Sequence, residues 1–128
     1  MADDSFYMRH ALEEAKKAAA KGEVPVGAVI VCRDYIIARS HNLTETLNDV
    51  TAHAEILAIK EAQTALKTSR LNGCEMYVTL EPCPMCAWAI SMSGISTVYF
   101  GAYNQQYGAL ESSVHLPLNT KLKIYGGI

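Results

Sequence analysis

Residues 74–101 read CEMYVTLEPCPMCAWAISMSGISTVYFG and carry the pattern of a strand, a helix and a second strand. Alternating and β-branched residues predict a strand over 74–80, and the following prolines predict a helix over 84–93, closed by Gly94. Pro84 suits the first helical turn, where its missing N–H would have no partner. With a strand over 97–101, the segment predicts two parallel strands joined by a right-handed crossover.

The rest of the chain extends this alternation. Residues 26–32 are almost continuously apolar, which is typical of a strand buried on both faces, and a turn at Arg33-Asp34 leads into a strand over 35–39. We expect a helix over 53–66 and a last strand over 122–125. An amino-terminal helix over 5–21 is expected to end at Gly22 and to bury a face made of Phe6, Met8, Leu12, Ala15 and Ala19.

These elements predict an α/β fold, a three-layer α-β-α sandwich around a five-stranded mixed sheet. The 128 residues are half hydrophobic, enough for one sizeable core, and no linker, repeat or low-complexity tract divides them. We therefore expect one domain over 1–128. The formal net charge of −2 is weak evidence for nucleic-acid binding, because phosphate contacts need clustered lysines or arginines.

Three residues of the types that bind zinc fall at two predicted helix starts. His53 opens the helix over 53–66, and Cys83 and Cys86 lie at the start of the helix over 84–93. Two cysteines at this spacing can reach one ion, because the second points back from the first turn. His53, Cys83 and Cys86 are therefore the candidate metal ligands, and three protein ligands leave a fourth tetrahedral position for water.

Glu55 is the candidate catalytic residue. It projects about 200° around the helix from His53, so we do not expect it to bind the same ion, although it can reach a water held there. Zinc lowers the pKa of bound water to about 7, and a nearby carboxylate can carry protons to a leaving group. The pattern predicts hydrolytic removal of an amine from an aromatic ring carbon, with release of ammonia.

Each part of this pattern also has an ordinary structural explanation. A single histidine at a helix start is more often a cap or a packed side chain, and a single C-x-x-C occurs in structural zinc sites, in redox sites and by chance. Cys32 and Cys74 are expected to be small core residues on strands. Because H-x-E and P-C-x-x-C occur together in one short chain, each opening a helix, the catalytic zinc site is favoured.

The two motifs resemble those of the zinc-dependent nucleoside and nucleic-acid deaminases. Four segments also resemble the bacterial tRNA adenosine deaminases, namely MRHAL at 8–12, EVPVGAV at 23–29, TAHAE at 51–55 and TLEPC at 79–83. The resemblance implies a cytidine deaminase-like fold, one Zn²⁺ per subunit, and conversion of adenosine to inosine at the wobble position of tRNA. It also implies a homodimer that binds the tRNA anticodon stem-loop.

The same resemblance implies four substrate-binding residues. Asn42 matches an asparagine that hydrogen-bonds the target base, and Val26 matches an apolar wall of the base pocket; Ala54 and Asn104 complete the set. Without the resemblance, Asn42 would be interpreted as a turn residue and Val26 as a core residue.

Two features differ from the family pattern. Gly101 is followed by Ala102-Tyr103-Asn104, whereas the family usually has Gly-Ala-Arg-Asp or a close variant. Tyr103 therefore replaces an arginine, which attracts phosphate, by a ring that can stack on a base. We expect a changed preference for the sugar or the anticodon context. The sequence ends at Ile128, where the family normally continues through an amphipathic helix, and we expect 1–128 to lack that helix.

Two other functions share these motifs. The segment EPCPMC at 81–86 also looks like guanine deaminases, so deamination of a free nucleobase or nucleoside, such as guanine or cytosine, is one alternative. The other is a noncatalytic zinc-bearing subunit that binds RNA, although Glu55 argues against it because a structural zinc site needs no proton shuttle.

The sequence also predicts a cytoplasmic protein with no membrane partner. Asp3 and Asp4 stand where a secretory signal would be basic, and no apolar stretch is long enough to span a bilayer. Zinc-binding cysteines must stay reduced, which agrees with that compartment.

Overall fold

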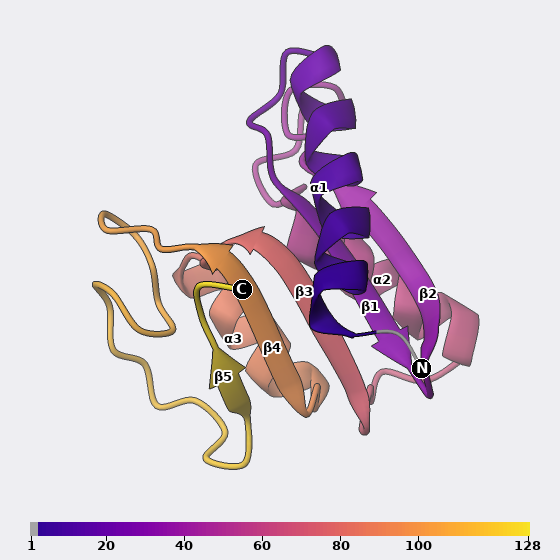
Figure 1. Ribbon diagram of the computed structural model, residues 1–128, viewed down its shortest axis with the longest axis vertical. Coiled ribbons are helices and arrows are strands. Elements are labelled where there is room, and N and C mark those ends of the chain that lie inside the picture. The colour runs from indigo at the N-terminus through magenta and orange to yellow at the C-terminus, as the bar shows by residue number, and fades with distance from the viewer. Residues whose placement is uncertain (1–2) are drawn as a thin grey trace.

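The computed structural model describes residues 3–128 (Figure 1). The elements are α1 (Asp4–Ala20), β1 (Gly27–Cys32), β2 (Tyr35–His41), α2 (Ala54–Leu66), β3 (Cys74–Leu80), α3 (Pro84–Ser93), β4 (Thr97–Ala102) and β5 (Lys123–Tyr125). Every element predicted from the sequence is present, and β3 and α3 have the predicted bounds.

The strands form one mixed sheet in the order β2-β1-β3-β4-β5. β1 pairs antiparallel with both β2 and β3, whereas β3, β4 and β5 are parallel. The predicted β-α-β unit over 74–101 is therefore confirmed. Arg33 and Asp34, between β1 and β2, both have positive φ, as a two-residue type I′ hairpin turn requires.

Helices cover the sheet on both faces, with α1 on one side and α2 and α3 on the other (Figure 1). The larger core cluster includes Ile30, Met76 and Phe100 of the sheet together with Ala58 of α2 and Ile90 of α3. A smaller cluster packs α1 against the opposite face through Tyr7, Met8, Ala11, Val29, Val31 and Tyr77. This is the predicted three-layer α-β-α sandwich.

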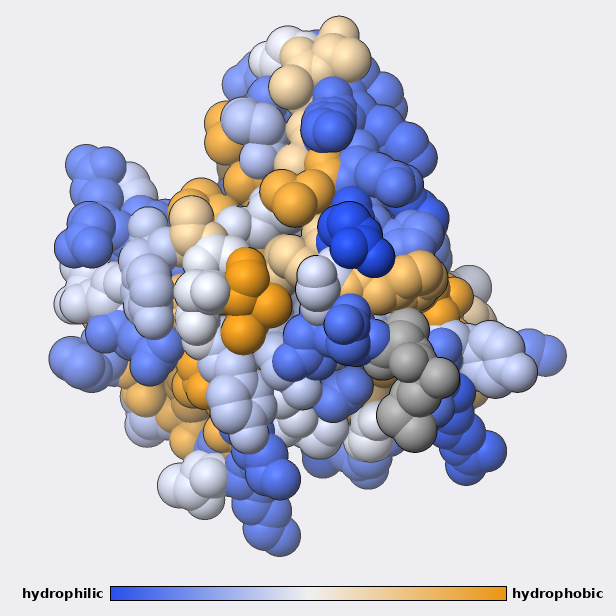
Figure 2. Space-filling model, in the orientation of Figure 1, coloured by the Kyte–Doolittle hydropathy of each residue, from blue (hydrophilic) through white to orange (hydrophobic). Residues whose placement is uncertain are grey.

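The buried face of α1 differs from the sequence prediction. Phe6, Leu12 and Ala19 are exposed, and the residues that pack inward are Tyr7, Met8, Ala11, Glu14, Ala15 and Ala18. The prediction is confirmed for Met8 and Ala15 and wrong for Phe6, Leu12 and Ala19, because the true stripe contains a glutamate and small alanines and its apolar period is weak. The outward side of α1 is mostly hydrophilic (Figure 2).

Cys32 and Cys74 are paired on neighbouring strands, and Trp88 lies on α3. Cys74 is buried, while its ladder partner Cys32 is only partly buried. Trp88 is 41% exposed, since Cys86, Ala87 and Ile90 form the buried side of α3. No helix within residues 3–128 combines the length and apolar character needed to cross a membrane.

Candidate metal centre and catalytic pocket

The first two candidate ligands lie at equivalent positions of two helices. His53 is the N-cap residue of α2 and Cys83 is the N-cap residue of α3; both have extended backbone, and neither side chain makes a capping hydrogen bond. Pro84 follows Cys83 in the first turn, as predicted, and Cys86 lies two residues further along. Because the side chains do not cap their own helices, they are free to turn toward each other.

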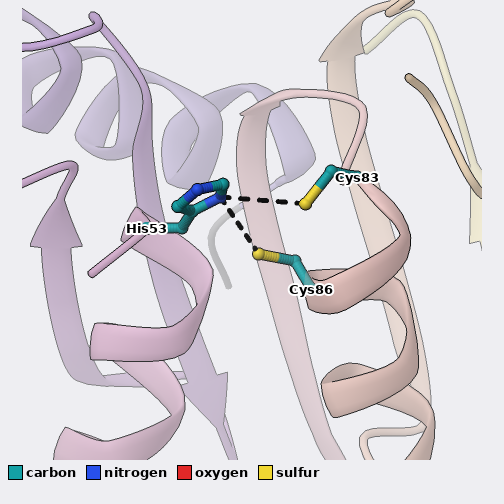
Figure 3. Close-up of side chains that lie close together, drawn as sticks. All are labelled: His53, Cys83 and Cys86. Carbon is teal, nitrogen blue, oxygen red and sulfur yellow. Dashed lines mark hydrogen bonds between the residues drawn. The ribbon is translucent and has the colours of Figure 1, made fainter. Parts of the chain in front are cut away.

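The three ligand atoms converge on one point (Figure 3). His53 Nδ1 is 3.8 Å from Cys83 Sγ and 3.6 Å from Cys86 Sγ, and all three atoms lie within 4.8 Å of one another. Ideal Zn–N and Zn–S bonds at the tetrahedral angle separate nitrogen from sulfur by about 3.6 Å. The nitrogen and sulfur donors thus already stand at distances that suit a tetrahedral zinc ion.

The two thiols influence each other's ionisation. A hydrogen bond from Cys86 lowers the pKa of Cys83 to about 5 against the opposing effect of burial, and His53 adds to the lowering. The pKa of Cys86 is raised, because its hydrogen bond to Cys83 and its burial both favour the thiol. Ionisation of the pair is therefore easier at Cys83 than at Cys86, and binding of a metal by both sulfurs must release the proton of Cys86.

Glu55 lies in the first turn of α2 but is not part of the ligand group. Its side chain is only 4% exposed, and burial raises its pKa to about 7. A carboxyl group with a pKa near neutrality can both accept and donate a proton under physiological conditions, which is the property that general acid–base catalysis needs.

A cavity of about 220 Å³ opens above these residues. It brings together candidate ligands His53 and Cys83, candidate catalytic residue Glu55, and all four candidate substrate-binding residues. Its full lining is Val24, Val26, Asn42, Thr44, His53, Ala54, Glu55, Leu80, Glu81, Cys83, Asn104 and Tyr107. Cys86 lies outside the lining and is fully buried.

Two of the lining amides have defined hydrogen-bond partners. Asn42 Nδ2 donates to Glu23 Oε1 and Thr44 Oγ1, both at 3.4 Å, which sets the orientation of the amide. Asn104 Oδ1 accepts from the backbone N–H of Gln106 at 3.2 Å and of Tyr107 at 3.0 Å. Asn104 therefore shapes the turn that carries Tyr107, a role that the sequence did not indicate.

Several residues of the site were missed in the sequence. Val24, Thr44, Leu80, Glu81 and Tyr107 line the cavity, and Glu23 lies behind Asn42. The available signal for Glu23 and Val24 was the family-like segment 23–29, and for Leu80 and Glu81 the family-like segment 79–83. Thr44 and Tyr107 lie in loops whose approach to the metal centre depends on the tertiary fold.

The protein-family model for the cytidine and deoxycytidylate deaminase zinc-binding region matches residues 1–102 of the sequence. These residues include the whole His53, Cys83 and Cys86 group. The chain belongs to this deaminase family. A family of zinc-binding deaminases and a His-Cys-Cys cluster of tetrahedral dimensions together identify zinc as the metal that the residues fit.

Two curated relatives have names that specify a substrate. The tRNA-specific adenosine deaminase of Bacillus subtilis is 53% identical over 116 residues, spanning 91% of this chain and 72% of the relative. The tRNA-specific adenosine deaminase of Aquifex aeolicus is also 53% identical, over 84% of this chain and 71% of its own.

Two solved structures extend the comparison to the fold. One, from studies of A-to-I editing by tRNA:A34 deaminases at the wobble position of transfer RNA, has a TM-score of 0.93 and 46% identity, covering 98% of this chain and 100% of that one. A guanine deaminase of Bacillus subtilis has a TM-score of 0.78 and 30% identity, covering 93% and 87%.

Proposed function

We propose that this protein is a zinc-dependent hydrolase that deaminates adenosine to inosine at the wobble position of tRNA. The observation that carries the proposal is one cavity holding His53, Cys83, Glu55 and Asn42, in a chain 53% identical to relatives named tRNA-specific adenosine deaminases. The buried, cavity-lining Glu55 also favours an enzyme over a noncatalytic zinc-bearing subunit, which has no use for a proton carrier.

In this proposal His53, Cys83 and Cys86 hold one zinc ion per subunit. Zinc, when bound, supplies a water of lowered pKa and therefore a nucleophile at neutral pH. Glu55 takes up a proton and delivers it to the departing amine, as its pKa of about 7 allows. Loss of the amine from the ring carbon then yields ammonia and the oxo product.

The remaining lining residues recognise the substrate. The amide of Asn42 is held in a fixed orientation and hydrogen-bonds the base, while Val26 and Ala54 provide the apolar walls that enclose the ring. Asn104 contacts the nucleotide from the loop after β4. A cavity of this size takes a base only when it is unstacked, which agrees with a single-stranded loop such as that of the anticodon.

The test offers purified, zinc-loaded protein an anticodon stem-loop with a wobble adenosine, next to free adenosine, adenine, guanine and cytosine. We expect inosine in the stem-loop only. Glu55→Gln should reduce the rate at least about 100-fold with zinc content unchanged, since general acid–base catalysis contributes 10²–10⁴-fold. Absence of inosine with the wild-type protein would refute the proposal.

Guanine deamination is the second candidate. The structural similarity to a guanine deaminase at 30% identity and the EPCPMC segment at 81–86 favour it. Both candidates use the same metal ligands, so only the product distinguishes them. Release of ammonia and xanthine from guanine, with no change in the stem-loop, would favour this candidate.

We also propose that residues 1–128 act as one domain in a cytoplasmic homodimer. Met85, Trp88 and Met92 are exposed on α3 at 37%, 41% and 60%, and their spacing places them on one side of the helix. Burial of such side chains is a favourable contribution to association. Light scattering should give the dimer mass for the wild type and a lower mass for Trp88→Glu; a monomeric wild type would refute the dimer.

A further inference from the structure

Glu81 lies between the end of β3 and the Pro82-Cys83 pair, and its side chain is only 1% exposed. Its carboxylate accepts hydrogen bonds from one loop, residues 103–112. Oε1 accepts from the backbone N–H of Asn104 at 3.2 Å, and Oε2 from those of Leu110, Glu111 and Ser112 at 3.1, 2.6 and 2.9 Å. The hydroxyl of Ser112 also donates to Oε1.

The loop is shaped around this carboxylate. A Cβ at Gly108 would lie 2.4 Å from the Glu81 carboxyl carbon, so only glycine leaves the necessary room. Ala109 N–H donates to the Pro82 carbonyl at 2.9 Å, which fastens the loop a second time to the segment that carries Cys83. The loop therefore has a fixed position relative to the metal ligands.

The charge of Glu81 is balanced by dipoles. The ion pairs within residues 3–128 do not include Glu81. Convergent backbone N–H groups form a suitable nest for an anionic oxygen.

The same loop supplies one wall of the cavity, through Asn104 and Tyr107. We propose that Glu81 is a positioning residue for substrate binding, since it sets the distance between this wall and the centre formed by His53, Cys83 and Cys86. The inference rests on the proposed function and adds to it the group that holds the nucleotide-contacting loop. Glu81 acts on the substrate through Asn104 and Tyr107, whereas Glu55 acts on the reacting atoms.

Glu81→Gln is the informative substitution. It keeps the volume but replaces one acceptor oxygen by an NH₂ group, which must then face backbone N–H donors. The loop is expected to move away from the cavity, while the metal ligands, which lie at the starts of α2 and α3, stay in place. Glu81→Asp keeps the charge and should retain part of the function.

The experiment measures KM, kcat, zinc content and thermal stability on the stem-loop substrate. For Glu81→Gln we expect KM to rise about 10-fold or more, kcat to change less than about 3-fold and zinc to stay bound, since hydrogen bonds to charged groups are among the stronger ones. The KM of Glu81→Asp should lie between those of the wild type and Glu81→Gln. Glu13→Gln, the same charge change on exposed α1, should match the wild type.

A double-mutant cycle separates positioning from general stability. Asn104→Ala should raise KM, and adding Glu81→Gln should raise it little further, because both substitutions disable the same wall. Gly108→Ala, which pushes against the carboxylate, should reproduce the KM effect and provides a second variant if Glu81→Gln does not fold. Additive KM effects, or a parallel loss of zinc and kcat in these variants, would overturn the inference.

Failure of the proposed function is a separate outcome. If the wild type deaminates guanine and leaves the stem-loop unchanged, the tRNA assignment fails, and the same variants are measured on guanine. A KM effect that depends on Asn104 would then support Glu81 as a positioning residue, and its absence would refute that role.

Discussion

Among the individual residues of the metal centre, two are N-cap residues whose side chains make no capping hydrogen bond. Serine, threonine, aspartate and asparagine stabilise a helix start by accepting a backbone hydrogen bond, a contribution of about 1 kcal/mol. His53 and Cys83 occupy those positions without making such a bond. The metal-free protein thus forgoes stability at two helix starts that lie beside the cavity.

Cys83→Ser tests this trade between capping and metal binding. Serine at the N-cap should accept a hydrogen bond at the start of α3, so the metal-free variant should be about 1 kcal/mol more stable than metal-free wild type. Zinc content should fall to near zero because a thiolate ligand is lost. Plasma spectrometry and thermal melts with and without chelator check both results; retention of a full zinc equivalent would contradict the ligand assignment.

The sequence predicted the residues of the site whose signals are local. His53, Glu55, Cys83 and Cys86 fall within two short motifs at helix starts, where spacing alone fixes geometry. Glu81 has no comparable signal, because its hydrogen-bond partners lie 23 to 31 residues later in a loop without regular structure. Such contacts depend on how the loop returns to β3.

At the element scale, the position of α1 depends on a missing side chain. A Cβ at Gly27 would lie 2.0 Å from the carbonyl oxygen of Ala11 and 2.5 Å from the nitrogen of Ala15. The start of β1 can approach the α1 backbone this closely only because residue 27 is glycine. The same close approach explains why the α1 residues facing Gly27, Ala11 and Ala15, are alanines rather than large apolar residues.

Gly27→Ala should therefore destabilise the protein. We expect a loss of about 3 kcal/mol, because backbone atoms cannot move aside without shifting the helix. Gly73→Ala is the matched control, since a Cβ there meets nothing within 4 Å and only its φ of +80° resists the change, at about 1 kcal/mol. Denaturant titration compares them, and equal losses would argue against the steric explanation.

The sequence predicted where the helices and strands begin and end more accurately than it predicted which side of α1 is buried. Pro84, Gly94 and the Arg33-Asp34 turn mark ends by local conformational rules, and those ends are confirmed. The face of α1 could not be found from apolar spacing, because its buried glutamate is accommodated by groups from a distant strand.

At the scale of the whole molecule, an ion-pair cluster joins α1 to β2. Buried Glu14 accepts hydrogen bonds from Lys17, Arg39 and His41, at 2.8, 3.0 and 2.9 Å. Burial would raise the pKa of Glu14, yet these bonds outweigh it and hold the pKa at about 2. His41 directly precedes Asn42, so the cluster also fixes the strand end that leads into the cavity.

Acidification should weaken the protein through this carboxylate. Because the pKa of Glu14 is lower in the folded protein than its usual 4.5, its stabilisation is complete above that value and is lost as the pH falls toward 2. Glu14→Gln should remove most of this acid sensitivity, on the order of 2 kcal/mol between pH 7 and pH 3, and lower the stability at pH 7. Melts between pH 7 and pH 3 test it; parallel curves for variant and wild type would contradict the assignment.

One row of aromatic rings crosses the sheet on the α1 side. Tyr77 stacks on Tyr99 at a centroid distance of 4.4 Å, and Tyr7 and Tyr125 extend the row at 5.2 and 5.3 Å. Close, fixed rings give near-ultraviolet circular dichroism that disappears when tertiary packing loosens. The single tryptophan, Trp88, lies instead on the exposed part of α3. The chain therefore carries two optical reporters, with tyrosine dichroism following the integrity of the sheet and tryptophan emission following events at the surface of α3.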